Sequence, residues 1–269
     1  MLKQRLVTAA IFIPLIIILV WFGAPWFSIF LAIVVLIGTF EFLRMTEGFD
    51  KRCPLTYFGL LWSLAIALSP YYKGTNILPV VMASAVVVSL IWLLFYSPRE
   101  KAFHNWAWML AGVLYVGWML SYWINLRTLG DGASWVYLAM FSVFANDSGA
   151  FFVGKVWGKR PLALAISPGK TKEGALGGIL SAIVAAIIIY QIPILFSYST
   201  LEYWQVILIG GLIGIFAQLG DLVESLLKRN IGVKESGNLL PGHGGVLDRF
   251  DSLIFVGAMV YYYALWIVA

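Results

Sequence analysis

The sequence is poor in charged residues and has a single cysteine. Asp, Glu, Lys and Arg make up 12% of its 269 residues, about half of the roughly 25% that a soluble domain carries, whereas 61% of the residues are hydrophobic. A chain so short of charge cannot cover a folded surface in water, which excludes a soluble enzyme, a disordered protein and a nucleic-acid-binding protein. The lone cysteine, Cys53, excludes an internal disulfide. The composition therefore predicts a polytopic membrane protein.

Long apolar runs recur along the whole chain, and a spanning helix needs roughly 20 such residues. The runs are too long and too uniformly apolar for alternating strands, so we expect helices. The sequence predicts an all-α polytopic membrane protein with about nine transmembrane helices. The expected ranges are 6–22, 26–43, 54–72, 77–96, 107–126, 133–153, 174–195, 204–223 and 252–269. The first is expected to be a retained helix, because no small-residue cleavage site follows it.

The positive charges predict the orientation of these helices. With the N-terminus in the cytoplasm, 16 of the 18 Lys and Arg residues fall on the cytoplasmic side, and only Lys73 and Arg127 fall outside. Because Lys and Arg are enriched in cytoplasmic loops, we predict a cytoplasmic N-terminus and a C-terminus on the outside.

Polar clusters are unevenly distributed along the chain. Residues 1–130 read as N-terminal transmembrane helices with short loops, whereas nearly all the acidic, glycine-rich and basic clusters lie in residues 131–269. No low-complexity linker divides the two parts, and the sequence shows no internal repeat. We therefore expect one integral membrane unit whose chemistry, including any catalysis, lies in the C-terminal region.

Aspartates gather near the cytoplasmic ends of the predicted helices. Asp147, Asp221 and Asp251 lie near these ends on three helices, and Asp248 lies in the loop just before the last one. An ionised carboxylate in hydrocarbon is costly, so each needs a partner, a metal or a wet cavity. We expect the four carboxylates to meet at one depth, where an oxygen-only cluster suits Mg²⁺ bound together with substrate phosphates.

Two glutamates also lie in or at the edge of predicted spans. Glu41 stands at the cytoplasmic end of the second span, three residues before Arg44. We expect a plain interfacial ion pair between these two side chains. Glu224 lies at the edge of the eighth predicted span, where its carboxylate needs a partner, a metal or a wet cavity.

The segment 145–154 places Asn146, Asp147, Ser148 and Gly149 late in a spanning helix. Small and hydroxyl residues there are explained by close helix packing. That explanation does not account for Asp147, which is expensive unless it faces a wet cavity.

The segment 167–174 combines a Pro-Gly turn with Lys170, Thr171 and Lys172 at the start of the next predicted helix. The first backbone N–H groups of a helix have no partner within it. Together with the two lysines and the threonine, they predict a docking place for a phosphate.

The segment 220–252 is the longest polar stretch. If residues 221–228 are helical, Asp221, Ser225 and Lys228 lie on one face, at i, i+4 and i+7. That face would offer a metal ligand, a hydroxyl and a cation in a row.

The loop that follows is rich in glycine. In Gly242-His243-Gly244-Gly245 the glycines let the backbone come close to a ligand, because they carry no side chain to exclude it. Asp248 and Asp251, at i and i+3, can then point the same way.

These motifs resemble a known family. The run S-x-L-K-R-x4-K-E-S-G-x-L-x-P-G-H-G-G-x-L-D-R-x-D, from Ser225 to Asp251, resembles the signature of the phosphatidate cytidylyltransferases, also called CDP-diacylglycerol synthases. The upstream S-P-G-K-T-x-E-G and N-D-S-G-A-F segments match other stretches of this family in the same order. One departure is Lys234-Glu235, where the family usually has Lys-Asp. The N-terminal half resembles the family only in being several hydrophobic helices.

The resemblance implies transfer of CMP from CTP to phosphatidate, which gives CDP-diacylglycerol and pyrophosphate in phospholipid biosynthesis. It implies Mg²⁺, with a second, monovalent cation such as K⁺, and a homodimer. The implied location is the bacterial inner (cytoplasmic) membrane, as a multi-pass protein whose active site faces the cytoplasm. CTP would then enter from the cytoplasm and phosphatidate sideways from the membrane lipid, so the cavity is expected to open in both directions.

The resemblance also implies roles for the matching positions. The expected metal ligands are Asp221, Asp248 and Asp251, which together with Ser225, Lys228 and His243 form the expected catalytic set. The expected substrate-binding residues are Asp147, Lys170, Thr171, Lys172, Arg229 and Arg249. His243 either hydrogen-bonds a phosphate or orders the loop, and both roles stay open.

Two other classes fit the residues less well. The CDP-alcohol phosphotransferases would rest on Asp248-x-x-Asp251, but Ser252 follows where that family has glycine, and the last span carries no further acid. An ion-coupled transporter predicts inverted repeats and polar residues at mid-membrane, and the sequence has neither.

Overall fold

The computed structural model describes residues 13–46, 53–72, 77–95, 100–192, 194–196, 201–239 and 244–267. These residues are overwhelmingly helical. The helices are Ile13–Phe22, α2 (Trp26–Arg44), α3 (Pro54–Leu68) with a 3₁₀ turn (Ser69–Tyr71), α4 (Ile77–Leu93), α5 (Ala102–Gly112), a π-helical turn (Val113–Trp118), α6 (Met119–Arg127), α7 (Gly132–Trp157), α8 (Lys172–Tyr190), α9 (Tyr203–Ile231) and α10 (Leu247–Ile267).

An all-α membrane protein is the fold that this architecture confirms. Within the described residues, a helix lies at each predicted span. Five helical stretches are long and apolar enough to cross a membrane, namely α2, the continuous stretch Ala102–Arg127, α7, α8 and α9. The number nine and the orientation of the ends stay predictions.

The eighth predicted span, 204–223, lies within a longer helix. α9 continues to Ile231 and ends at Gly232, which adopts the left-handed conformation with φ +81°. Glycine adopts this conformation at little cost and is the usual residue after a helix. The helix therefore continues beyond its apolar part and includes Glu224 and Lys228.

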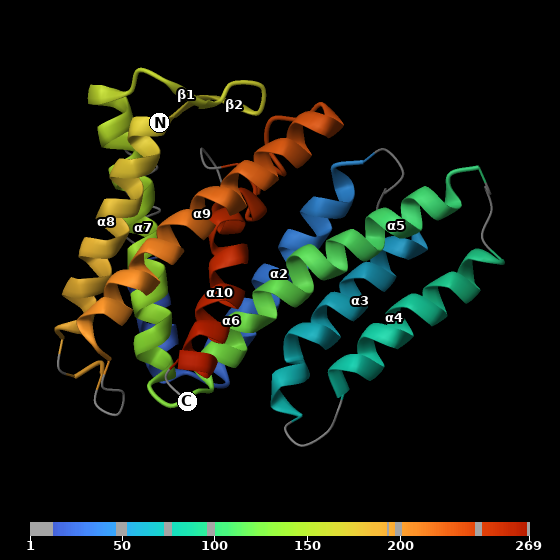
Figure 1. Ribbon diagram of the computed structural model, residues 1–269. Coiled ribbons are helices and arrows are strands. Elements are labelled where there is room, and N and C mark those ends of the chain that lie inside the picture. The colour runs from blue at the N-terminus through green and yellow to red at the C-terminus, as the bar shows by residue number, and fades with distance from the viewer. Residues whose placement is uncertain are drawn as a thin grey trace.

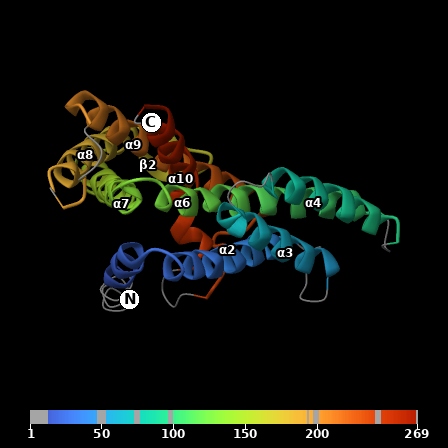
Figure 2. The same cartoon turned by 90° about the horizontal axis from the view of Figure 1, so that it is seen from below.

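The helices form two connected groups. α7 packs on α8, α8 on α9 and α9 on α10, while α2 packs on α3 and α3 on α4 (Figure 1). α10 joins the groups, because it also contacts α6, α7 and α2. Seen from below, α2 and α3 lie on one side of α6 and α10, and α9 lies on the other (Figure 2). α10 is therefore the element on which both groups converge.

A small antiparallel hairpin departs from the all-helical expectation. β1 (Pro161–Ala163) pairs with β2 (Ser167–Thr171), so the Ser-Pro-Gly-Lys-Thr segment is a strand and not only a turn. Glu173, in the first turn of α8, accepts hydrogen bonds from the backbone N–H groups of Lys159 and Arg160, each at 3.1 Å. These bonds fix the hairpin on the end of α8.

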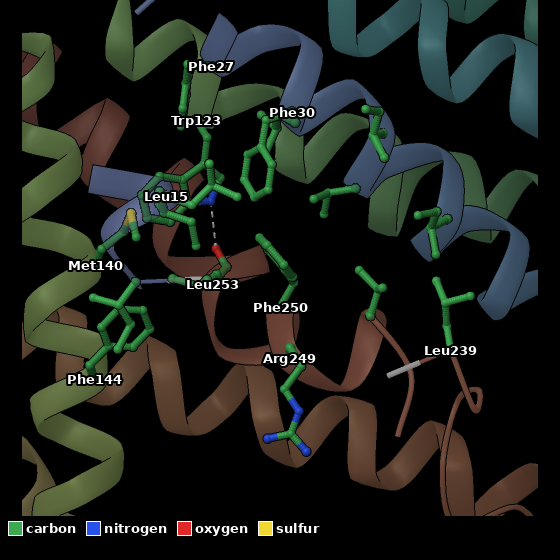
Figure 3. A pocket seen from close by; sticks show the side chains of 17 residues that line it. Leu15, Phe27, Phe30, Trp123, Met140, Phe144, Leu239, Arg249, Phe250 and Leu253 are labelled. Atoms are coloured by element: carbon green, nitrogen blue, oxygen red, sulfur yellow. Dashed lines mark hydrogen bonds between the residues drawn. The ribbon is translucent and has the colours of Figure 1, made fainter. Parts of the chain in front are cut away.

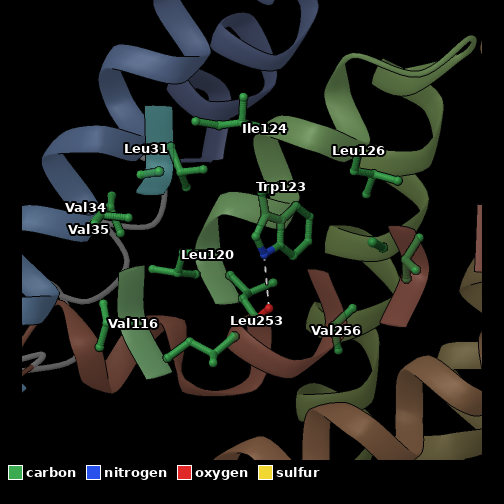
Figure 4. Packing of buried hydrophobic residues seen from close by; sticks show 14 of the residues in the cluster. Leu31, Val34, Val35, Val116, Leu120, Trp123, Ile124, Leu126, Leu253 and Val256 are labelled. Carbon is green, nitrogen blue, oxygen red and sulfur yellow. Dashed lines mark hydrogen bonds between the residues drawn. The ribbon is translucent and has the colours of Figure 1, made fainter. Parts of the chain in front are cut away.

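The core between α2, α6 and α10 is apolar (Figure 4). Trp123 of α6 is 4% exposed, and its indole N–H donates to the carbonyl oxygen of Leu253 in α10 at 3.1 Å. A buried indole nitrogen needs such a partner. The bond therefore fixes the position of α10 along α6.

The turn between the first two helices depends on one glycine. Gly23 has φ +67°, and a Cβ there would lie 2.6 Å from Nη2 of Arg127. Arg127 donates to the carbonyl oxygens of Val20 (2.8 Å) and Trp21 (3.2 Å), which end the helix Ile13–Phe22. A cation at a helix C-terminus is favourable, so this arginine holds the turn between the first two helices.

Gly210 and Gly211 of α9 allow a matched test of helix packing. A Cβ at Gly210 would lie 2.8 Å from Cα of Ile183 in α8, whereas one at Gly211 would find its nearest atom, Ile183 Cδ1, at 3.8 Å. We expect Gly210→Ala to cost about 1–3 kcal/mol of stability. Gly211→Ala should keep or raise stability, because alanine favours a helix. Thermal unfolding in detergent measures both, and equal melting temperatures would contradict the close approach of α8 and α9.

Candidate functional site

The hairpin and α9 bring the first predicted residues together. Nζ of Lys170, on β2, lies 2.7 Å from Oδ2 of Asp221, on α9. The hydroxyl of Ser225, one helical turn later, lies 3.4 Å from Oδ1 of the same aspartate. The predicted helix over 221–228 is confirmed. Its Asp221 contacts Lys170 of β2.

Two further aspartates lie around this pair. Asp147 of α7 accepts a hydrogen bond from the side chain of Asn146 at 3.0 Å, and Asp251 of α10 accepts one from the N–H of Ser252 at 2.6 Å. Both carboxylates are within electrostatic range of Asp221 and of each other. Carboxylates from α7, α9 and α10 thus share one polar region.

A second ionic cluster lies one and two turns further along α9. Nζ of Lys228 is 2.7 Å from Oδ1 of Asp248 and 3.1 Å from Oε1 of Glu224. The side chain of Glu224 is fully buried, and within the described residues Lys228 is the cation paired with it. The lysine therefore balances two carboxylates in a setting with little water, where an unpaired charge is costly.

Asp248 also organises the loop before α10. Its Oδ2 accepts from the backbone N–H and the hydroxyl of Ser236, both at 2.9 Å, and from the N–H of Gly245 at 2.8 Å. Among the described residues, Oδ2 thus accepts from three donors, whereas Oδ1 pairs with Lys228.

Glu41 does not form the expected ion pair with Arg44, and that prediction is wrong. Within the part of the chain that the structure describes, its Oε1 accepts from the N–H of Val246 at 3.0 Å and its Oε2 from the N–H of Leu247 at 2.8 Å. The guanidinium of Arg44 lies instead over the ring of Phe40. The unpaired N–H groups at the start of α10 are stronger partners for a buried carboxylate than an exposed cation one turn away. An acidic residue in an apolar helix signals that Glu41 has a polar partner. The sequence does not identify this partner, because Leu247 lies about 200 residues away along the chain.

Tyr115 is a neighbour of the acids that the sequence did not single out. It lies in the π-helical turn Val113–Trp118, and its buried hydroxyl has no hydrogen-bond partner among the described residues. It lies within electrostatic range of Glu224, Asp251 and Asp221. A π-helical turn often marks a functional position, but one more tyrosine in an apolar helix carries no such signal in the sequence.

Three predicted substrate-binding residues lie at the rim of the hairpin. Thr171 caps α8, because its Oγ1 accepts from the N–H of Gly174 at 3.1 Å. One of the N–H groups expected to be free for a phosphate is thus already satisfied. The side chain of Lys172 is exposed, and Nε of exposed Arg229 lies 3.4 Å from the carbonyl oxygen of Ile166. His243 lies outside the described residues.

Arg249 borders a different space. An apolar cavity of about 580 Å³ lies beside the first turns of α10, and among the described residues that line it Arg249 alone is charged. Phe27 and Phe30 of α2, Trp123 of α6 and Leu253 of α10 line this cavity, and the guanidinium of Arg249 extends away from them (Figure 3). Arg249 follows Asp248 directly in the sequence and lies at the edge of this cavity.

The acidic residues suit a hard divalent cation. In the described ranges no three Asp, Glu, His or Cys side chains are placed to hold a metal ion by themselves. Mg²⁺, however, is commonly held by one or two carboxylates together with substrate phosphates and water. Asp221 is paired with a lysine and electrostatically coupled to Asp147 and Asp251. This all-oxygen donor set fits a cation that arrives with a phosphate.

Known proteins resemble this chain over nearly its whole length. The sequence model of the cytidylyltransferase family matches residues 3–267. The phosphatidate cytidylyltransferase of Bacillus subtilis (strain 168) is 36% identical over 266 residues, which cover 97% of this chain and 96% of that protein. The enzyme of the same name from Staphylococcus haemolyticus is 35% identical over 257 residues (94% and 95%), and that from Synechocystis sp. is 33% identical over 290 residues (97% and 95%).

The double pairing of Lys228 predicts a large effect on stability. Lys228→Met leaves the buried Glu224 without a countercharge, which should cost about 3–5 kcal/mol. The double variant Lys228→Met, Glu224→Gln should recover much of this loss, because it removes the isolated charge. Arg229→Met, at the exposed neighbouring position, is the control. Thermal unfolding in detergent measures all three, and a Lys228→Met variant as stable as Arg229→Met would contradict the pairing.

Proposed function

The chain belongs to the cytidylyltransferase family, and from this premise we propose that it transfers CMP from CTP to phosphatidate, giving CDP-diacylglycerol and pyrophosphate. The observation that carries the proposal is the set of lysine–carboxylate pairs, Lys170 with Asp221 and Lys228 with Asp248, beside an apolar cavity. Such a site offers charge for two phosphorylated substrates and apolar surface for one of them.

The proposed reaction mainly requires neutralisation of the negative charge on the two substrates. A phosphate oxygen of phosphatidate bonds to the α-phosphorus of CTP, and the bond from that phosphorus to the oxygen bridging to the β-phosphate breaks, so pyrophosphate leaves with the electron pair. The nucleophile is already ionised, so no strong general base is needed. Holding two polyanions together and stabilising the leaving group are the main tasks.

The basic residues are proposed to perform these tasks. Lys170 and Lys228 are each paired with a carboxylate and would exchange that partner for a phosphate when substrate binds. Ser225 would hold Asp221 in place through its hydroxyl. The further phosphate-binding residues are proposed to be Thr171, Lys172, Arg229 and Arg249, and His243 is proposed to contact phosphate or order its loop.

Mg²⁺ is proposed to be held by Asp221, with Asp251 and the Oδ1 atom of Asp248 as further ligands and Asp147 as a neighbouring acceptor. When bound, it would neutralise charge on the CTP phosphates and the departing pyrophosphate. A monovalent cation such as K⁺ is proposed as a second balancing charge in this acidic region.

The apolar cavity is proposed to receive the acyl part of phosphatidate. Val246, Phe250 and Leu253 line the cavity, whereas Asp248 and Asp251 lie on the neighbouring face of the same helix. Positions i, i+4 and i+7 share a helix face. The first two turns of α10 thus separate an apolar surface from an acidic one, which matches a lipid whose phosphate is attached to long chains.

The setting of the site follows from the same reasoning. We propose a multi-pass protein of the bacterial inner membrane with nine spans, its N-terminus and active site on the cytoplasmic side and its C-terminus outside. CTP would then arrive from the cytoplasm and phosphatidate from the membrane lipid. A homodimer is proposed from the resemblance of the motifs alone.

Loss of the proposed metal ligands should abolish transfer. The purified protein is mixed with phosphatidate, Mg²⁺ and radiolabelled CTP, and label is followed into the chloroform phase. We expect the Asp221→Asn, Asp248→Asn double variant to lose at least about 100-fold in turnover, because phosphoryl-transfer catalysis rests on such charge stabilisation. Glu100→Gln, at an exposed turn residue before α5, is the control. Full activity of the double variant would contradict the assignment.

Filling the cavity should discriminate between lipids by chain length. Val34 of α2 lines the cavity and is 6% exposed. Val34→Trp should raise the KM for long-chain phosphatidate about 10-fold or more, because one or two lost methylene contacts between the lipid chain and the cavity are worth about 1–3 kcal/mol. The KM for dihexanoyl phosphatidate should rise much less. The control is Val87→Trp, at an exposed position of α4. If Val34→Trp changes the KM for neither lipid, the acyl chains bind elsewhere.

A further inference from the structure

Glu41 is the one acidic residue of α2, and its carboxylate reaches the loop that the proposed site depends on. We infer that Glu41 is a positioning residue for the transfer reaction: it fixes the start of α10 and thereby the places of Asp248 and Asp251. This inference rests on the proposed function for its kinetic consequence, but its geometry stands by itself.

The carboxylate acts as a helix cap supplied by a distant element. The two oxygens of Glu41 accept from the consecutive N–H groups of Val246 and Leu247, at 3.0 and 2.8 Å. Those N–H groups have no partner inside α10, and the side chain of Val246, just before the helix, offers no acceptor. A negative charge at a helix N-terminus is favourable. α2 therefore provides what the local sequence lacks.

The loop is shaped around this carboxylate. A Cβ at Gly237 would lie 2.7 Å from Oε1 of Glu41, and one at Gly245 would lie 2.6 Å from Oε2. Any larger residue at either position would push the carboxylate away, so the loop approaches it on two sides through glycine. Glu41 is 6% exposed, and within the described residues no cation forms a salt bridge with it. The N–H groups of α10 are thus its principal charge partners.

One hydroxyl links Glu41 to the proposed catalytic residues. Oγ of Ser236 lies 3.4 Å from Oε2 of Glu41 and 2.9 Å from Oδ2 of Asp248. Asp248 in turn contacts Lys228. A change at Glu41 can therefore reach Asp248 through both the backbone of residues 245–247 and the side chain of Ser236.

Removing the charge of Glu41 while keeping its size tests the inference. In Glu41→Gln the amide keeps one acceptor but turns an NH₂ group toward an N–H donor. We expect kcat to fall about 10- to 100-fold, the usual effect of losing a residue that orients a ligand, with the KM values for CTP and phosphatidate changing less than about threefold. Thr39→Val is the matched control, because Thr39 is buried in the same helix and within the described residues its hydroxyl has no partner.

A double-mutant cycle separates positioning from a general loss of structure. If Glu41 acts through Ser236 and Asp248, Glu41→Gln should cost much less in a Ser236→Ala background than in the wild type, because linked residues are non-additive. Hydrogen exchange at the amides of residues 245–247 should also be faster in Glu41→Gln and unchanged in Thr39→Val. If Glu41→Gln does not fold, Gly237→Ala, which presses a methyl group on the same carboxylate, should give the same fall in kcat.

The outcomes distinguish this inference from the proposed function. An inactive wild type would overturn the proposed function, and the exchange measurement would still decide the positioning of the loop. If the wild type is active, any of three results would overturn the inference. Glu41→Gln could keep its kcat within twofold of the wild type, or the effects of Glu41→Gln and Ser236→Ala on kcat could multiply. Hydrogen exchange at residues 245–247 could also be unchanged in Glu41→Gln.

Discussion

The first turn of α10 is held by two carboxylates, one buried and one half-buried, and the rest of the site depends on this constraint. Glu41, from α2, binds the N–H groups of Val246 and Leu247. Asp248, from α10 itself, turns back to Gly245 and Ser236 and also meets Lys228 of α9. Because buried polar groups are costly to leave unpaired, these bonds leave the loop before α10 little freedom. Helices from both groups are thereby tied to one point.

The same turn of α10 separates two chemical environments. One face carries Asp248, which pairs with Lys228 of α9, and Asp251, while the neighbouring face lines the apolar cavity with Phe250 and Leu253. The bond from Trp123 to the carbonyl oxygen of Leu253 fixes the helix between these environments. An amphiphilic substrate needs such a boundary, because its phosphate and its chains must be bound at the same time.

Much of this arrangement could be predicted from the sequence, and the reason is local. Asp221, Ser225 and Lys228 follow the period of a helix, and the helix that carries them extends through all three. The apolar runs predicted where helices lie, because burial of a polar backbone in lipid leaves few other solutions. The family resemblance also followed from three short segments, in each of which the matching residues are close together in the chain.

What the sequence could not predict depends on pairings between distant residues. Glu41 and Leu247 are separated by most of the chain, so nothing in the spacing of Glu41 and Arg44 could distinguish a surface ion pair from a helix cap. The hairpin was missed because Ser-Pro-Gly-Lys-Thr has the composition of a turn, and only its pairing with residues 161–163 makes it a strand. Tyr115 was missed because its position depends on a π-helical turn in an otherwise ordinary apolar helix.

The most direct test of the account is to locate a divalent cation in crystals of the protein grown with CTP and Mn²⁺. Anomalous scattering from manganese identifies the ion without reference to any assumed ligand. The account predicts a peak about 2.0–2.3 Å from a carboxylate oxygen of Asp221, on the side facing Asp251 and Asp248. A fully occupied peak remote from these three aspartates, with CTP bound beside it, would contradict the assignment of the site.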